Sequence, residues 1–405
     1  MKRKLRLLSL LLVFAFILPV SADYDGEAAE TLLDTLQETD EYWQAVSLSA
    51  AVGTPQLSAK AAILMDAATG AVLFEQNADE PLPPASVTKV MTLLLVAEAI
   101  DRGELTFDEM VTASTEASQM GGSQIYLKEH EQMSVDDLLK ATVVASANDA
   151  AYALGERVAG SMTAFVQQMN DRAAALGMEN TVFYNPTGLP AEGHVSSARD
   201  IALMSRELIK HEFIFEYTSI WTDTLRDGQT MLVNTNKLIR RYNGATGLKT
   251  GSTDDAGYCL SATAERDGLS LIAVVLGCPS GAERFDDAKL LLDYGYLHYA
   301  LVTPTLPATL PDCIVKNGRQ TSVAVTAGSA SPLLVQKGDE DKLTVTVSDF
   351  PPLTAPVKKG QEVGKIIVSL GGETKLEIPV TAAADVEKLS WWYLFTCAVK
   401  NFLTV

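Results

Sequence analysis

The chain has 405 residues, of which 47% are hydrophobic and 20% charged, a composition typical of globular proteins rather than of disordered or fibrous ones. Its 51 acidic residues outnumber its 32 basic residues, and the resulting net charge of −19 argues against a nucleic-acid partner. The four cysteines and four histidines show none of the close spacings of metal ligands, so we expect no metal and no cofactor.

The first 22 residues are typical of a secretory signal peptide. Four basic residues precede an apolar run over residues 7–20, and the small residues that follow predict cleavage after Ala22. An uncleaved anchor is the alternative, although the run is short for a membrane span. We therefore expect an exported protein, which keeps 28 basic and 51 acidic residues after cleavage and so has a net charge of −23.

Two segments follow the signal peptide. Residues 23–59 contain eight acidic residues and no lysine or arginine, which predicts a solvated N-terminal extension without chemistry of its own. Residues 60–302 carry a hairpin near each end, with a mostly helical stretch between the hairpins and a final helix after the second one. The expected elements are a hairpin over 61–76, helices after Ser86 and Ser134, helices over 162–177 and 197–211, a hairpin over 257–278 that turns at Asp267–Gly268, and a helix over 284–301. This order predicts an α+β fold with one sheet built from distant segments and covered by helices.

From residue 303 the pattern becomes that of an all-β domain, which we place at residues 303–382. A boundary rich in proline leads into four runs of alternating polarity, at 321–327, 342–348, 365–371 and 374–380.

Residues 383–405 are expected to form a polar linker and a C-terminal amphipathic helix. Its apolar stripe includes the adjacent Trp391 and Trp392, which favour a membrane interface, and a helix from Ser390 is too short to span a bilayer. We expect the helix to lie on the outer face of the cytoplasmic membrane; a core helix is the alternative.

Three short motifs carry the chemistry. Ser86 and Lys89 stand three residues apart after two prolines, so Ser86 is either a helix cap or a nucleophile with its base. Ser146 and Asn148 lie in a break between helices, and Lys249, Thr250 and Gly251 precede the second hairpin. Each motif alone has a structural explanation, but the three together in this order favour a serine enzyme whose base is a lysine.

The residue types fit that chemistry. A neutral lysine takes the serine proton, Ser146 relays a proton to the leaving amine, and Asn148 holds the substrate amide. Lys249 and Thr250 bind a substrate carboxylate, and Gly251 lets an extended peptide approach the strand. We expect burial and the second cation to keep Lys89 neutral, while Lys249 stays charged for the carboxylate.

The motifs resemble those of the penicillin-recognising serine enzymes. "ASVTKVMT", "SANDAAYALGE", "FYNPTGLP" and "ATGLKTGSTDDAGYCLSATAERDGLSLIAVVLG" are similar to segments of the low-molecular-mass penicillin-binding proteins that are D-alanyl-D-alanine carboxypeptidases. The resemblance covers residues 60–300, and the β-domain and last helix fit more loosely. It implies a β-lactamase/transpeptidase-like catalytic domain, peptidoglycan stem peptides ending in D-Ala-D-Ala as substrates, and β-lactams as covalent inhibitors. It also implies acylation of Ser86, with Lys89 as base, Ser146 assisting proton transfer, and an oxyanion hole formed by the amides of Ser86 and Ser252.

Two other functions remain open at this point. A class A β-lactamase would need a Glu-x-x-Leu-Asn segment between the second and third motifs, and none occurs between Asn148 and Lys249. A wall-binding or sensor protein without turnover would not need the intact motif residues.

Cys259 and Cys278 flank the second hairpin turn. We expect them on one face of the sheet but two residues out of register, and hence as free, buried thiols rather than a disulfide.

Overall fold

The computed structural model describes residues 53–403 of the chain. The predicted signal peptide and residues 23–52 of the acidic extension lie outside the described residues.

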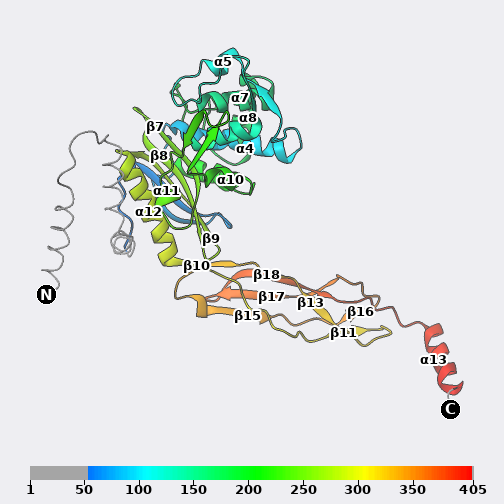
Figure 1. The fold of residues 1–405 in the computed structure, drawn as a ribbon. Coiled ribbons are helices and arrows are strands. Elements are labelled where there is room, and N and C mark those ends of the chain that lie inside the picture. The colour runs from blue at the N-terminus through cyan, green and yellow to red at the C-terminus, as the bar shows by residue number, and fades with distance from the viewer. Residues whose placement is uncertain (1–52, 404–405) are drawn as a thin grey trace, which may run out of the picture. The chain divides into compact units, whose positions relative to one another are not determined.

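The first part of the described chain is built on a five-stranded antiparallel sheet with the order β2-β1-β9-β8-β7 (Figure 1). Its strands are β1 (Ala61–Asp66), β2 (Val72–Gln76), β7 (Ala245–Thr253), β8 (Gly257–Arg266) and β9 (Leu269–Cys278). β1 pairs with β9 although some 200 residues separate them, so the sheet unites the two ends of this part of the chain. The prediction of one sheet built from distant segments is confirmed, and β7 lies at its edge.

The sheet separates two apolar cores. Alternate residues of β1 and β9 point to opposite faces: Ile63 and Val274 belong to one core cluster, and Leu64 and Ala273 to the other. Because both faces are covered, these strands are apolar along their whole length, as the burial of all six β1 residues shows.

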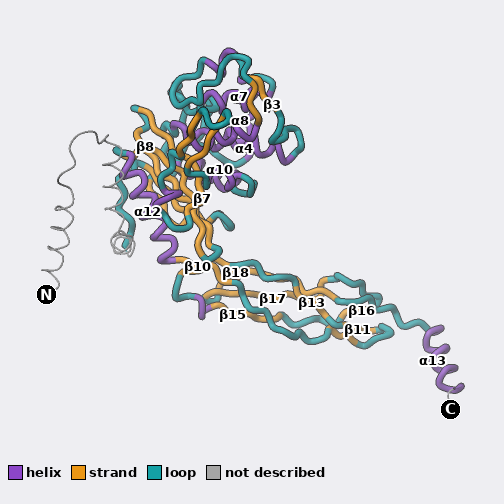
Figure 2. Tube along the Cα trace, viewed as in Figure 1, coloured by secondary structure: helices purple, strands orange, loops and turns teal. Residues whose placement is uncertain are grey.

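Helices cover both faces, as Figure 2 shows. The larger layer contains α4 (Lys89–Asp101), α5 (Thr115–Ser118), α6 (Val135–Val144), α7 (Asn148–Ala159), α8 (Met162–Ala175), α9 (Ala198–Leu208) and α10 (Ile214–Thr218). Two small two-stranded sheets accompany these helices: β3 (Met110–Thr112) pairs with β4 (Gln132–Ser134), and β5 (Thr222–Leu225) pairs with β6 (Thr230–Val233). The other face packs against α12 (Gly281–His298) and α11 (Leu238–Arg241). Ser134 caps α6 as expected, because its side chain accepts a hydrogen bond from the Asp137 amide.

Two boundaries differ from the expected ones. The helix that we expected over 284–301 ends at His298, because Tyr299–Val302 forms β10 and pairs with β14 (Leu333–Gln336). The acidic extension does not stay solvated up to residue 59: the amides of Ser58 and Ala59 donate to the Asp287 carboxylate, and Ala59 joins the core.

The two cysteines of the second hairpin lie on opposite faces of the sheet, which corrects the same-face expectation. The register shifts between Tyr258 and Leu260, and Gly277 has a φ of +68°, so one extra residue interrupts the alternation. Cys259 therefore joins one core cluster and Cys278 the other. Both are free and buried, as expected, although the reason is the bulge rather than a diagonal register.

The C-terminal part is an all-β domain with a core of its own. One sheet has the order β12-β11-β16 and a second the order β13-β18-β17-β15. The bounds are β11 (Cys313–Lys316), β12 (Ser322–Val323), β13 (Val325–Ala327), η2 (Glu340–Lys342), β15 (Leu343–Val347), β16 (Leu353–Thr354), β17 (Glu362–Leu370) and β18 (Glu373–Ala382). The first predicted run, at 321–327, corresponds to β12 and β13. The runs at 342–348, 365–371 and 374–380 correspond to β15, β17 and β18, in that order. The helix α13 (Trp391–Leu403) ends the described chain.

Candidate active site

Ser86 lies in a short 3-10 turn, η1 (Ala85–Thr88), that leads directly into α4. Neither the turn nor the helix has a side-chain cap, so Ser86 does not act as a helix cap. Its Oγ instead accepts a hydrogen bond from Lys89 Nζ at 3.0 Å. One helical turn therefore brings the hydroxyl and the amine within reach of proton transfer.

Lys89 is completely buried, and three oxygen atoms surround its amine. Besides Ser86, Nζ donates to Asn148 Oδ1 at 2.6 Å and to the Thr187 carbonyl at 2.8 Å. Burial lowers the pKa of Lys89 well below its usual range, and the charge of Lys249 lowers it further. The site thus favours a neutral amine, which is the form that can accept the Ser86 proton.

The second motif lies where α6 and α7 meet, as the sequence predicts. Ser146 is buried and has a φ of +61°, and this left-handed residue turns the chain between the two helices. Asn148 begins α7, and its carboxamide is occupied at both ends, by Lys89 and by the Gly121 carbonyl at 2.6 Å. In this structure Asn148 therefore positions Lys89. The sequence predicted that Asn148 holds the substrate amide, but it did not predict this contact with the lysine.

The third motif occupies the edge strand β7. Lys249 is buried with Nζ 3.0 Å from the Thr250 carbonyl, and Thr250 Oγ1 donates to Thr235 Oγ1 at 2.7 Å. Burial lowers the pKa of Lys249 to about 7, and the nearby charge of Arg284 contributes. This shift disfavours the charged form of Lys249, whereas the role that the sequence predicts for it, binding a carboxylate, needs the charge.

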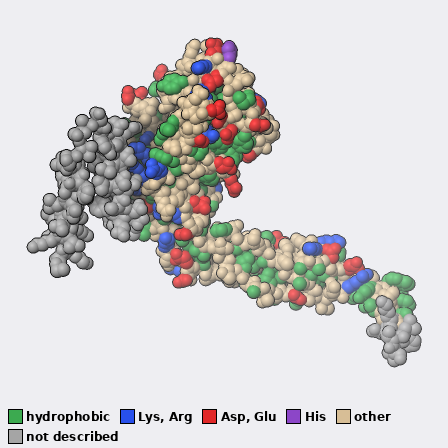
Figure 3. All heavy atoms as spheres, in the orientation of Figure 1, with side chains coloured by type: hydrophobic (Ala, Val, Ile, Leu, Met, Phe, Trp, Pro, Cys, Tyr) green, Lys and Arg blue, Asp and Glu red, His purple; other side chains and the backbone are tan. Residues whose placement is uncertain are grey.

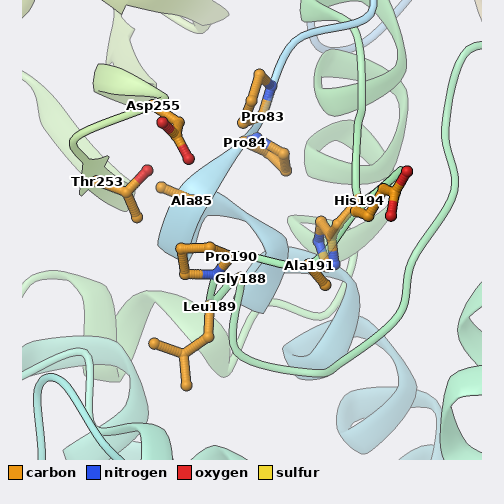
Figure 4. Close-up of a pocket in the computed structure, with 11 residues that line it drawn as sticks. Pro83, Pro84, Ala85, Gly188, Leu189, Pro190, Ala191, His194, Thr253 and Asp255 are labelled. Atoms are coloured by element: carbon orange, nitrogen blue, oxygen red, sulfur yellow. The ribbon is translucent and has the colours of Figure 1, made fainter.

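Two glycines allow the nucleophile turn to pack closely. A Cβ on Gly251 would lie 2.8 Å from the Ser86 amide nitrogen, so the glycine is required by the protein's own backbone and not only by an approaching substrate. Gly188 has a φ of +80°, and a Cβ there would lie 1.8 Å from the Ala85 carbonyl oxygen. The segment around Gly188 therefore also packs tightly against the turn (Figure 4).

Two residues of the site were not identified from the sequence. Arg284, on α12, donates to the Gly251 carbonyl at 3.2 Å, and its charge reaches Lys249. His194 bonds the Thr88 hydroxyl through Nε2 at 2.9 Å, while its Nδ1 accepts the Tyr184 amide. Neither belongs to a short motif, and only the tertiary fold brings them to the site. Among the described residues, no group of three or more His, Cys, Asp or Glu side chains could hold a metal ion.

Comparisons with known proteins agree with this geometry. A model of the D-alanyl-D-alanine carboxypeptidase family matches residues 48–280, and a model of the penicillin-binding protein 5 C-terminal domain matches residues 312–388. The chain is 41% identical over 341 residues to D-alanyl-D-alanine carboxypeptidase DacF of Bacillus subtilis, covering 82% of this chain and 86% of that protein. It is 38% identical to DacC of Escherichia coli, covering 83% and 86%.

Solved structures show the same likeness. Penicillin-binding protein 5 from Haemophilus influenzae superposes with a TM-score of 0.70 at 31% identity, covering 83% of this chain and 99% of that chain. The ampicillin-bound form of penicillin-binding protein D2 from Listeria monocytogenes gives a TM-score of 0.55 at 40% identity, covering 59% and 98%. The chain therefore belongs to the D-alanyl-D-alanine carboxypeptidase family of low-molecular-mass penicillin-binding proteins, the serine carboxypeptidases that act on peptidoglycan.

Proposed function

We propose that the terminal D-alanine leaves through an acyl-enzyme on Ser86. Neutral Lys89 takes the hydroxyl proton as Oγ bonds to the carbonyl carbon of the penultimate D-alanine. The observation that carries this role is the 3.0 Å contact between Lys89 Nζ and Ser86 Oγ at a fully buried lysine. The amides of Ser86 and Ser252 are the proposed donors to the oxyanion that forms on the carbonyl oxygen.

The remaining steps release D-alanine and regenerate the free enzyme. The peptide C–N bond breaks, and the departing amine receives a proton that Ser146 passes from Lys89. Water then attacks the ester carbonyl, and Lys89 takes a proton from the water and passes it to Oγ as the bond between Oγ and the acyl carbon breaks. Ser86 regains its hydroxyl group and the shortened peptide leaves with a new terminal carboxyl group. Lys249 and Thr250 bind the terminal carboxylate of the substrate, which restricts the reaction to the end of the stem peptide.

We also propose that β-lactams acylate Ser86. The support is the likeness to a protein whose structure contains bound ampicillin, together with the intact motif residues here. A β-lactamase remains the less supported function, since residues 149–248 contain no Glu-x-x-Leu-Asn segment for rapid deacylation. Release of D-alanine from a pentapeptide, measured beside nitrocefin turnover, separates the two: a carboxypeptidase gives the first product and a β-lactamase the second.

The pKa of Lys249 predicts the alkaline limb of the pH profile. With a pKa of about 7, Lys249 loses its charge above neutral pH, so kcat/KM for a D-Ala-D-Ala peptide should fall there. Lys249→Arg stays charged, so its kcat/KM should be lower at pH 7 but should keep its value to higher pH. Lys140→Arg, at an ion-paired position on α6, is the control and should leave the profile unchanged. An alkaline limb at the same pH in Lys249→Arg would assign the limb to another group.

We propose further that α13 binds the outer face of the cytoplasmic membrane. No helix in residues 53–403 is long and apolar enough to cross a bilayer. Trp391, Trp392 and Phe395 are exposed, and the rings of Trp391 and Phe395 stack at 5.5 Å. None of the described α13 side chains joins a core cluster, which disfavours a core helix. An exposed aromatic face on a short terminal helix is typical of an interfacial anchor.

Removing α13 should release the protein from membranes. Deleting residues 391–405 keeps the hydrogen bond from the Leu389 amide to the Asn317 carbonyl, so the β-domain should stay intact. We expect the truncated protein in the soluble fraction, with unchanged activity on a small soluble peptide. Trp391→Ala/Trp392→Ala in the full chain should weaken membrane binding in the same direction. A truncated protein that still sediments with membranes would refute the anchor.

A further inference from the structure

Basic side chains gather at one end of the β-domain, on three segments that are far apart in sequence. Residues 316–319, 358–359 and 385–388 meet there, because Gly318 pairs with Lys388 and Val357 pairs with Val386. Figure 3 shows Lys and Arg side chains at this end of the domain and hydrophobic side chains on α13. We call the five exposed basic residues of these segments the basic collar: Lys316, Arg319, Lys358, Lys359 and Lys388.

The collar is a cationic region in an acidic protein. Its three segments contain five basic and two acidic residues, a net charge of +3, whereas residues 303–390 as a whole contain nine basic and ten acidic residues. The two acidic residues each pair with a collar residue, Glu387 with Arg319 and Asp385 with Lys358. The collar residues that form no ion pair in the described part of the chain are Lys316, Lys359 and Lys388.

Two contacts join the collar to the start of α13. The Leu389 amide donates to the Asn317 carbonyl at 2.8 Å, and the Arg319 guanidinium lies 4.4 Å from the centre of the Tyr393 ring. Ser390 then caps the helix, because its Oγ accepts a hydrogen bond from the Tyr393 amide at 3.2 Å. The collar therefore adjoins the first turn of α13, which carries the two exposed tryptophans.

The range of electrostatic forces decides which charges act on a surface that α13 enters. Exposed charges are screened beyond about 8 Å at physiological salt, so the groups beside α13 count and the acidic residues elsewhere in the chain do not. Anionic phospholipids make a bilayer surface negative, and each lysine or arginine close to it strengthens binding about fivefold. The position of the collar thus opposes the repulsion expected between an anionic bilayer and a chain with a net charge of −19.

We propose that the basic collar binds the anionic headgroups of the phospholipid bilayer that α13 enters, so that the protein prefers anionic membranes. This inference rests on the proposed membrane binding of α13 and adds the class of lipid. The aromatic face of the helix attracts a bilayer of any headgroup charge, whereas the collar attracts only an anionic one. Three unpaired lysines, at about fivefold each, set an upper limit near a hundredfold, and partial screening reduces it.

Binding of the full-length protein to two kinds of vesicle tests the proposal. One kind contains phosphatidylcholine alone, and the other contains phosphatidylcholine with about one third phosphatidylglycerol. At 0.1 M salt we expect at least about tenfold tighter binding to the anionic vesicles. The ratio should fall toward one in Lys316→Gln/Lys359→Gln/Lys388→Gln, and in the wild type at 0.5 M salt. Binding to the neutral vesicles should not change in this variant, because α13 is intact.

A matched control removes three positive charges outside the collar. Lys337, Lys342 and Lys375 are exposed lysines of the same domain, so Lys337→Gln/Lys342→Gln/Lys375→Gln should keep the tenfold preference. Equal binding of the wild type to both kinds of vesicle would overturn the proposal, and so would a preference that the collar variant keeps.

Two further measurements separate the proposal from its alternatives. If α13 is not an anchor, the wild type and the protein without residues 391–405 will bind neutral vesicles equally weakly, an outcome distinct from a lost lipid preference. Soluble polyphosphate presents phosphate charge without a bilayer, and we expect it to bind the wild type more weakly than the anionic vesicles do. Binding to polyphosphate that is as tight, and that the collar variant loses, would assign the collar to a dissolved polyanion and overturn the assignment to lipid.

Discussion

Ser86→Ala is expected to lower D-alanine release at least about a thousandfold, because without Oγ no acyl-enzyme forms. The folded state should be little affected, since the Ser86 side chain caps no helix and is only half-buried. Thermal unfolding measured beside activity should therefore show a midpoint close to that of the wild type. Its one polar contact in the site is with Lys89, and the amine keeps two other acceptors in the variant.

Ser134→Ala is the matched control, because Ser134 is a serine that does cap a helix. Losing that cap should cost about 1 kcal/mol of unfolding free energy, while the activity of the folded enzyme should persist. The nucleophile variant Ser86→Ala should thus lose activity but not stability, whereas the cap variant Ser134→Ala should lose stability but not activity. Substantial activity in Ser86→Ala, or a stability loss there as large as in Ser134→Ala, would contradict the assignment.

Lys89→Arg should also abolish acylation, again by at least about a thousandfold. A guanidinium cannot take the Ser86 proton at any pH near neutrality, although it keeps a donor at the position. Rapid-quench labelling with penicillin measures this step, and circular dichroism shows whether the variant folds. Lys249→Arg should retain acylation and mainly lose substrate affinity, so equal residual labelling in the two variants would contradict the division of roles between the lysines.

On the acid side of the pH profile, the rate of penicillin labelling of the wild type should rise with pH. The pKa of Lys89 is well below its usual range, so the amine becomes neutral as the pH rises through that lowered value. Acylation should therefore increase with pH there and then level off. A rate that falls over the same range would mean that the protonated lysine is the active form.

Much of the fold was predictable because its signals are local. The Asp267–Gly268 hairpin turn has positive φ at both residues, and Ser134 bonds the amide three residues on, so each is encoded within a few positions. Short strands of the β-domain such as β11 and β14 were not recognised. Each strand has only four residues; β14 pairs with β10, some 30 residues earlier, and β11 pairs over two residues with β12 and over two with the distant β16.

The site was predictable as a set of motifs but not as a set of contacts. The Ser86 and Lys89 spacing fixes a pair one turn apart, whereas the contacts of Lys89 with Asn148 and Thr187 depend on how α4, α7 and a loop pack. The pKa of Lys249 depends first on its burial and then on Arg284, which lies 35 positions later on α12. The bulge at Gly277 places the two cysteines on opposite faces of the sheet, and a glycine in the sequence does not by itself predict a bulge.

The most direct test of the acyl-enzyme on Ser86 is to locate a penicillin adduct by mass spectrometry. Trypsin should release residues 61–89 as one peptide, because no lysine or arginine lies between Lys60 and Lys89, and Ser86 is its one serine. After brief reaction with penicillin, we predict a single adduct on this peptide, located at Ser86 by fragmentation and absent from Ser86→Ala. An adduct on any other peptide, or labelling undiminished in Ser86→Ala, would contradict the account.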